Sequence, residues 1–136
     1  MRLAADANVL LSAVLGGRAN AVLSHPEVED VFTTEVTFAE VQEYAAQLAR
    51  KKRLSLELVL LAMAALPVRI VSRDEYAASV RLAEKKIGKR DPDDVEILAL
   101  AIHLRIPVWS NDNDFEGTRV EWYTTARLLK KLVGGQ

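Results

Sequence analysis

Hydrophobic residues along the chain follow two alternating spacings. Short apolar runs, typical of buried strands, are each followed by a longer segment in which apolar residues recur every three or four positions, as on one face of a helix. Strands are predicted at residues 3–5, 31–34, 68–71, 106–110 and 120–123. Helices are predicted at residues 8–15, 36–48, 54–66, 74–87, 91–104 and 124–132. This alternation predicts an α/β fold in which helices cover both faces of a mainly parallel sheet of about five strands.

Size and composition narrow the class of protein. The chain has 136 residues, 50% of them hydrophobic, with 18 Lys and Arg against 19 Asp and Glu and no Cys. A chain of this length buries about two-thirds of its unfolded surface, so we expect one domain spanning residues 1–136. The balanced charge argues against coating of nucleic acid through net charge alone, and the lack of Cys excludes disulfide scaffolds and thiolate metal sites.

No segment is expected to target the chain to a membrane or for secretion. The N-terminus lacks the basic start and apolar run of a secretory signal, so we expect a cytoplasmic protein. The longest apolar stretch, residues 58–68, is about half the length needed to span a bilayer and contains Pro67. It is expected to belong to a core helix, although a dimer interface would have the same composition.

Acidic residues stand where predicted strands end or helices begin. Asp6 follows the first strand, Glu40 lies in the first turns of the next helix, Asp94 begins the helix at 91–104, and Asp112 and Asp114 follow the fourth strand. Because these positions share one edge of a parallel sheet, we expect the carboxylates to converge. Two carboxylates about 4 Å apart repel by roughly 4 kcal/mol at an effective dielectric near 20, and a hard divalent cation removes this repulsion. The pattern predicts a Mg²⁺ or Mn²⁺ site suited to hydrolysis at phosphorus.

Each acid also has a simpler structural interpretation. Thr37 and Glu40 fit a capping box, Asp94 could interact with a helix dipole, and Asp112 and Asp114 could form turns in an ordinary loop. These interpretations are favoured for any one acid taken alone. The recurrence of acids at four corresponding places is what favours a shared site.

Four segments resemble, in their order and spacing, the motifs of PIN-domain ribonucleases. They are residues 6–12, 34–41, 91–101 and 108–115. The resemblance covers nearly the whole chain and implies a three-layer α/β/α fold. It implies that Asp6, Glu40, Asp94 and Asp112 hold Mg²⁺ or Mn²⁺ for hydrolysis of single-stranded RNA, with Asp114 as an accessory acid.

The same resemblance implies supporting residues and partners. Asn8 and Ser110 match small polar positions that help to order the site in the family. Many compact bacterial and archaeal members are VapC-like toxins of toxin–antitoxin pairs. The resemblance therefore implies a small antitoxin and a homodimer as partners.

Three acids compete for the third motif position. Asp91, Asp93 and Asp94 are all candidates, but the family usually places its acid five and seven residues before two small residues. Ala99 and Ala101 therefore select Asp94. Asp91 is expected at the N-cap of the helix, and Asp93 is expected to interact with the helix dipole.

Basic residues near these motifs could contact RNA phosphates. The run at residues 51–53 and the pair Lys89 and Arg90 are simplest to interpret as solvated helix ends, with phosphate guidance as the functional alternative. Arg90 is the basic residue nearest the third motif, which makes it a weak candidate for substrate binding.

Three functions remain to be weighed. The first is a metal-dependent endoribonuclease, acting as a toxin or as an RNA-processing factor. A receiver-type signalling domain needs adjacent acids after the first strand and a Lys after the last, whereas Asp6 has no acidic neighbour and no Lys follows Val108 or Trp122 in the needed place. The third is an inactive PIN-like module for RNA binding or interaction, against which the complete acidic quartet argues.

Overall fold

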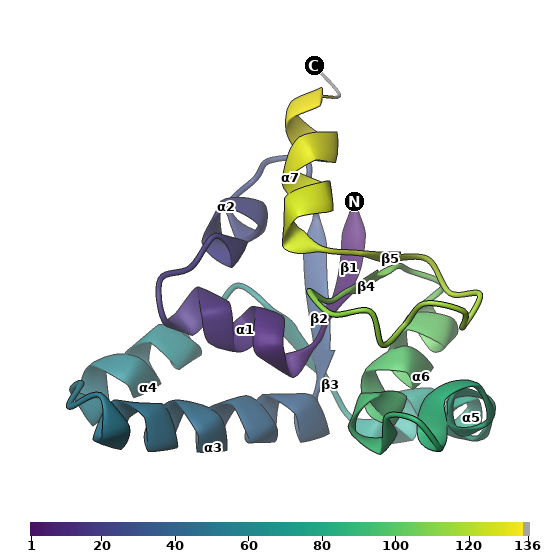
Figure 1. Cartoon of the computed structure of the whole chain (residues 1–136), viewed down its shortest axis with the longest axis horizontal. Helices are drawn as coiled ribbons and strands as arrows, with labels where there is room; N and C mark the ends of the chain where they lie inside the picture. Colours follow the sequence, from purple (N-terminus) through teal and green to yellow (C-terminus); the bar gives the residue numbers. More distant parts are fainter. Residues whose placement is uncertain (135–136) are drawn as a thin grey trace.

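A five-stranded parallel sheet forms the centre of the molecule (Figure 1). The computed structural model describes residues 1–134. The strands are β1 (Arg2–Ala5), β2 (Asp30–Thr34), β3 (Arg69–Val71), β4 (Val108–Trp109) and β5 (Trp122–Tyr123). Their order across the sheet is β3-β2-β1-β4-β5, and every neighbouring pair is parallel. The predicted parallel sheet is confirmed.

Helices cover both faces of this sheet. They are α1 (Ala7–Val14), α2 (Ala19–Leu23), α3 (Glu35–Lys51), α4 (Leu56–Ala64), α5 (Arg73–Ala83), α6 (Val95–Leu104) and α7 (Thr125–Gly134). A π-helical turn, η1 (Glu84–Gly88), extends α5, and a 3₁₀ turn, η2 (Pro92–Asp94), precedes α6. Figure 1 shows α5 and α6 together on one side of the sheet, and α1, α3 and α4 on the other.

The central strand β1 supplies side chains to two separate cores. Leu3 and Ala5 pack into the core formed with α1, α2, α3, α4 and α7, whereas Ala4 packs into the core formed with α5 and α6. This alternation follows from the two-residue period of a strand, and all three side chains are fully buried. The arrangement is the predicted three-layer α/β/α fold.

The start of α3 rules out the capping box that was the structural alternative for Thr37 and Glu40. The N-cap is Thr34, whose Oγ1 accepts a hydrogen bond of 2.9 Å from the backbone N–H of Thr37. Thr37 therefore lies inside the first turn, and Glu40 lies beyond it. Capping is thus not the role of the Glu40 side chain.

One aromatic residue of α3 lies outside its buried face. Val41, Ala45 and Ala49, four residues apart, form that face. Tyr44 follows Val41 at helical spacing, but 49% of its surface is exposed. Its side chain lies on the neighbouring face, which contains Glu40.

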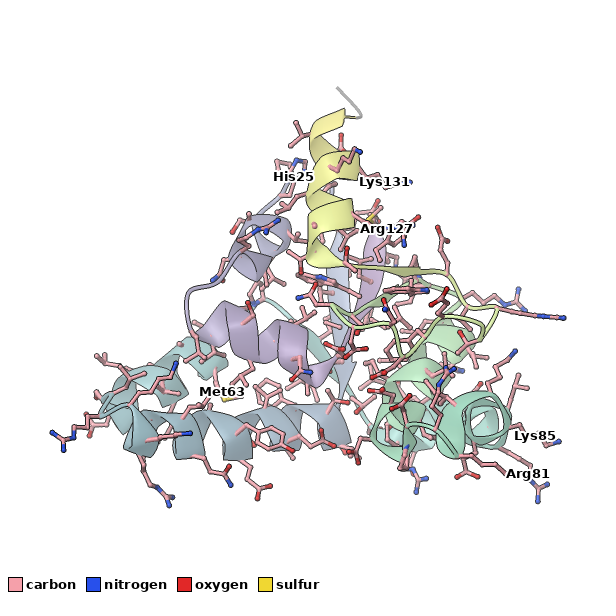
Figure 2. All side chains as sticks on the ribbon, in the orientation of Figure 1. His25, Met63, Arg81, Lys85, Arg127 and Lys131 are labelled. Carbon is pink, nitrogen blue, oxygen red and sulfur yellow. The ribbon has the colours of Figure 1, made fainter. Side chains whose placement is uncertain are left out.

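The apolar helix α4 is shorter and more exposed than expected. Val59 and Met63 are buried, and Met63 lies in the interior among α1, α3 and α4 (Figure 2). Leu58 and Leu61 are 67% and 64% exposed, so only one face of this helix belongs to the core. Within residues 1–134, no helix has both the length and the apolar character to cross a bilayer.

Two further differences concern short elements. α2 was not predicted, because five residues are too few to show a helical period. β4 has two residues rather than five, and Pro107 before it has no N–H for a strand ladder, although its carbonyl accepts from the Ala4 N–H at 2.9 Å.

Candidate functional site

The carboxyl ends of β1 and β4 lie side by side at the place where the strand order changes direction. β1 leads to β2 on one side and pairs with β4 on the other. The backbone N–H of Asp6, directly after β1, donates to the carbonyl of Trp109 in β4 at 3.1 Å. Such a switch point in a parallel sheet opens a crevice for ligands.

A pocket of about 370 Å³ occupies this edge. The predicted acids Asp6, Glu40, Asp94, Asp112 and Asp114 all line it, together with Asn8 and Arg90. The rest of its lining consists of Ala7, Thr37, Tyr44, Asp91, Pro92, Asp93 and Ile97. Residues far apart in the sequence therefore meet in one acidic pocket.

Asp6 is the most enclosed of these acids, with 4% of its surface exposed. Its Oδ1 accepts a hydrogen bond of 3.0 Å from the Val9 N–H, so the carboxylate caps α1. Burial is the main cause of a pKa raised to about 6, and the nearby Ser110 hydroxyl and Val9 N–H lower this pKa by less. The negative charges of Asp112 and Asp114 contribute to the same rise.

Ser110 and Asp112 order the loop after β4. The buried Ser110 donates from Oγ to Asp112 Oδ1 at 3.1 Å and accepts from the Asp112 N–H at 3.3 Å. Asp112 Oδ1 also accepts from the Asp114 N–H at 3.2 Å, which is the turn geometry expected for such an acid. The turn places the carboxylates of Asp112 and Asp114 in the lining of the pocket. These acids therefore form a turn and also belong to the shared site. Asn8 has an exposed side chain at the rim of the pocket.

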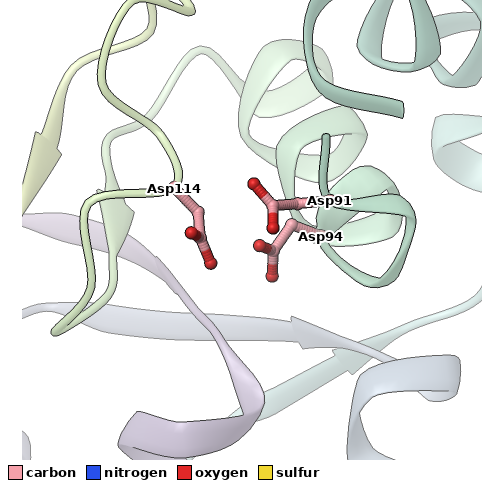
Figure 3. Close-up of side chains that lie close together, drawn as sticks. All are labelled: Asp91, Asp94 and Asp114. Carbon is pink, nitrogen blue, oxygen red and sulfur yellow. The ribbon is translucent and has the colours of Figure 1, made fainter. Parts of the chain in front are cut away.

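One of the three closest carboxylates belongs to Asp91, which was expected to cap a helix. Asp91, Asp94 and Asp114 each offer one oxygen atom, and these atoms lie within 4.8 Å of one another (Figure 3). Asp91 occupies the expected N-cap position, but its side chain accepts no capping hydrogen bond. The Asp94 N–H donates to the Asp91 carbonyl at 3.0 Å across the 3₁₀ turn, and the three-residue spacing of the two acids is the signal that could have identified the pair.

Burial, and after it the crowding of acids, raises several pKa values in the pocket. The pKa of Asp94 rises to about 8, first because of burial and then because of contact with the Asp114 carboxyl group and the charges around it. Burial is also the main cause of the raised pKa of Asp114. Glu40 has a raised pKa because of burial and the nearby charges of Asp93 and Glu43.

Arg90 is the basic residue that lines the pocket, and it is engaged with the protein. Its Nε lies 3.2 Å from Asp91 Oδ2, and its Nη2 donates to the backbone oxygens of Asp114 and, at 3.3 Å, Glu116. Lys86 supports the same loop by donating from Nζ to the Thr118 carbonyl at 2.9 Å. These contacts join the segment before α6 to the loop after β4.

The donor chemistry of the pocket fits a hard divalent cation. The converging ligands are carboxylate oxygens, and Mg²⁺ and Mn²⁺ favour oxygen ligands. The raised pKa values of Asp6 and Asp94 show that their negative charges are poorly compensated by the protein itself. A cation held between Asp91, Asp94 and Asp114, with Asp6, Asp112 and Glu40 beside it, would compensate them.

Comparison with known proteins gives consistent results for the fold. A search of curated proteins finds no match. The chain is similar to a chain of VapBC2 from Rickettsia felis bound to a promoter DNA fragment, with 12% identity, a TM-score of 0.66, and coverage of 91% of this chain and 98% of that one. It is also similar to a chain of a toxin–antitoxin complex from Klebsiella pneumoniae, with 20% identity, a TM-score of 0.66, and coverage of 90% and 97%.

A third similar chain comes from VapBC-1 of nontypeable Haemophilus influenzae. Its identity is 15%, its TM-score is 0.67, and the match covers 93% of this chain and 99% of that one. At these identities the likeness is one of fold. The PIN domain family itself matches residues 5–133, which is nearly the whole sequence. The chain therefore belongs to the PIN-domain family.

Proposed function

We propose that this protein is a metal-dependent endoribonuclease that hydrolyses phosphodiester bonds of single-stranded RNA. The observation that carries the proposal is the convergence of Asp6, Glu40, Asp94, Asp112 and Asp114 on one pocket at the switch point of the sheet. Membership of the PIN-domain family supports the same activity. The cation would be Mg²⁺ or Mn²⁺, because the pocket offers carboxylate oxygens.

The acids of the pocket would fall into two groups in this reaction. Asp94, Asp91 and Asp114 are close enough to hold one cation. Asp6 and Asp112 are fixed by hydrogen bonds from Val9 and Ser110, so their carboxylates are held in place before substrate arrives. Such preorganisation lowers the cost of reaching the transition state.

A bound cation supplies charge neutralisation at the scissile phosphate and lowers the pKa of water. Glu40 lies in the pocket on α3, and burial raises the pKa of its carboxyl group. A carboxylate with a raised pKa is a better proton acceptor near neutral pH. Glu40 would therefore take the proton of the attacking water as the water oxygen bonds to phosphorus. The bond to the leaving oxygen would break, and that oxygen would take a proton from solvent water.

An inactive PIN-like module is the main alternative. It would not need a pocket in which at least three carboxylate oxygens lie close enough to share a cation. A receiver-type domain needs a Lys beside its acids, whereas the basic residue in this pocket is Arg90, which binds backbone oxygens. Both observations favour the nuclease.

We further propose that the chain acts in the cytoplasm as the toxin of a toxin–antitoxin pair, rather than as an RNA-processing factor. The similar folds in solved toxin–antitoxin complexes support this role. The exposed Leu58 and Leu61 of α4 give the molecule an apolar surface that a protein partner would cover. A homodimer is the second partnership proposed, and it would use the same kind of surface.

Size-exclusion chromatography with light scattering tests the proposed homodimer. A parent dimer that becomes monomeric in a Leu58→Ser, Leu61→Ser variant would assign the α4 surface to self-association. A parent that is monomeric over the whole concentration range would contradict the homodimer.

The nuclease itself is tested with purified protein and a labelled single-stranded RNA of mixed sequence. Cleavage is expected with Mn²⁺ or Mg²⁺ and should stop when EDTA removes the cation. The same sequence as duplex RNA and as single-stranded DNA provides the substrate controls. A folded protein that binds Mn²⁺ and leaves every RNA intact would favour the inactive module.

A further inference from the structure

A second pocket adjoins the acidic one along α3. Its volume is about 370 Å³, and it is lined by Asn8, Leu11, Tyr44, Gln47, Leu48 and Lys51. Asn8 and Tyr44 line both pockets, so the two lie next to each other between α1 and α3, and we refer to them together as the groove. Nothing in the proposed chemistry of the carboxylates requires this second pocket.

The spacing of residues on α3 places a row of functional groups along the groove. Glu40, Tyr44, Gln47 and Lys51 are separated by four, three and four residues, which is the spacing of one helix face. At a rise of 1.5 Å per residue, Glu40 and Lys51 lie about 16 Å apart along the helix axis. The row leads from the acidic pocket to the positively charged ammonium group of Lys51 at the end of the helix.

We propose that this second pocket is a binding subsite for a nucleotide of single-stranded RNA next to the bond that is cut. The proposal rests on the nuclease function and deepens it. Tyr44 is half exposed between the two pockets, and an exposed aromatic ring can stack on any base. Asn8 and Gln47 line the same space with amide groups that can hydrogen-bond to base edges.

Lys51 supplies the charge that such a subsite needs. The acidic pocket repels RNA phosphates, so binding requires a positive group nearby. Lys51 is exposed, and within residues 1–134 its ammonium group makes no ion pair with an acid. It is therefore available for a phosphate of the nucleotide that occupies the pocket.

These features favour RNA over a protein segment as the occupant. A protein segment needs neither a neighbouring acidic pocket nor an aromatic ring shared between the two pockets. Leu11 and Leu48 supply the apolar part of the pocket lining, which suits the face of a single base.

The experiment compares cleavage by the parent protein with that by Tyr44→Ala, Tyr44→Phe, Lys51→Ala and Lys52→Ala, using one fluorescent single-stranded RNA and Mn²⁺. Tyr44→Ala should raise KM about tenfold, corresponding to the loss of one stacked base, and should change kcat by less than about threefold. Tyr44→Phe keeps the ring and should match the parent. Lys51→Ala should raise KM and weaken its dependence on salt, whereas Lys52→Ala, with the same charge change outside the pocket, should do neither.

A second measurement separates failure of the subsite from failure of the nuclease. Fluorescence anisotropy of the same RNA is measured with the parent, Tyr44→Ala and Lys51→Ala proteins in the absence of cleavage, with EDTA present. Weaker RNA binding by both variants supports the subsite even if the parent cuts no RNA. Absence of cleavage by the parent would count only against the proposed nuclease activity. Unchanged KM and unchanged anisotropy in both variants would overturn the subsite and leave the groove to a protein partner.

Discussion

The guanidinium group of Arg90 donates a hydrogen bond to the backbone oxygen of Asp114, a residue 24 positions further along the chain. Arg90 also contacts the Asp91 carboxylate and the Glu116 carbonyl. One side chain thus holds two acidic segments of the pocket at a fixed separation. The role supported by these contacts is positioning, while the substrate contact expected from the sequence stays a prediction.

Replacing Arg90 by Ala should loosen the loop that contains Asp112 and Asp114. The change removes hydrogen bonds at a partly exposed site, so we expect a loss of about 1 kcal/mol in the free energy of unfolding and a melting temperature lower by about 3–4 °C. Hydrogen exchange of the backbone in residues 112–118 should become faster. Lys89→Ala is the matched control, because Lys89 is an exposed basic neighbour outside the pocket lining. Equal exchange rates in both variants would contradict the positioning role.

The metal-free protein should become less stable as the pH rises from about 5 to 8. Asp6 and Asp94 have pKa values near 6 and 8 in the folded state. Unfolding returns both to about 3.9, so the folded state holds more protons in this window. By linkage, the free energy of unfolding falls with rising pH, and the penalty is complete above the folded pKa values.

Asp94→Asn should remove the upper part of this pH dependence. In EDTA at pH 8 the variant should melt about 3–8 °C above the parent, because an amide avoids the repulsion at this position at a gain of roughly 1–2 kcal/mol. Mn²⁺ should raise the melting temperature of the parent more than that of the variant. Thermal melts at several pH values, with and without Mn²⁺, measure both effects. A parent whose stability is flat between pH 5 and 8 would contradict the raised pKa values.

Asp91 should contribute to cation binding. Its carboxylate lies within 4.8 Å of those of Asp94 and Asp114, whereas Asp93 lines the pocket outside this cluster. Asp91→Asn should therefore weaken Mn²⁺ binding about tenfold or more, and Asp93→Asn, with the same change in charge, by less than about threefold. Isothermal titration calorimetry with Mn²⁺ alone gives both affinities. Equal losses would mean that net charge, not proximity, determines binding.

The convergence of the main acids could be foreseen because it depends on topology. Asp6 and Asp112 follow strands, Asp94 begins a helix and Glu40 lies in the second turn of one, and in a parallel sheet these ends share an edge. The family resemblance gave the same residues. The pattern of apolar positions was sufficient to predict all five strands and the layers around them.

Features that depend on local geometry could not be foreseen. The approach of Asp91 to Asp94 requires a 3₁₀ turn, which the sequence presented only as a helix start. The exposure of Tyr44 depends on which of two adjacent faces of α3 packs inward. The exposed Leu58 and Leu61 have the same composition as a buried face, and composition alone does not separate the two.

The most direct test of the acidic pocket as a nuclease site compares RNA cleavage by the parent, Asp94→Asn and Asp93→Asn proteins at saturating Mn²⁺. The melting temperature of each protein is measured in the same buffer, so that loss of fold is distinguished from loss of chemistry. We predict that the parent and Asp93→Asn cut single-stranded RNA, and that Asp94→Asn remains folded and does not cut. Cleavage by folded Asp94→Asn at the parent rate would contradict the proposed site.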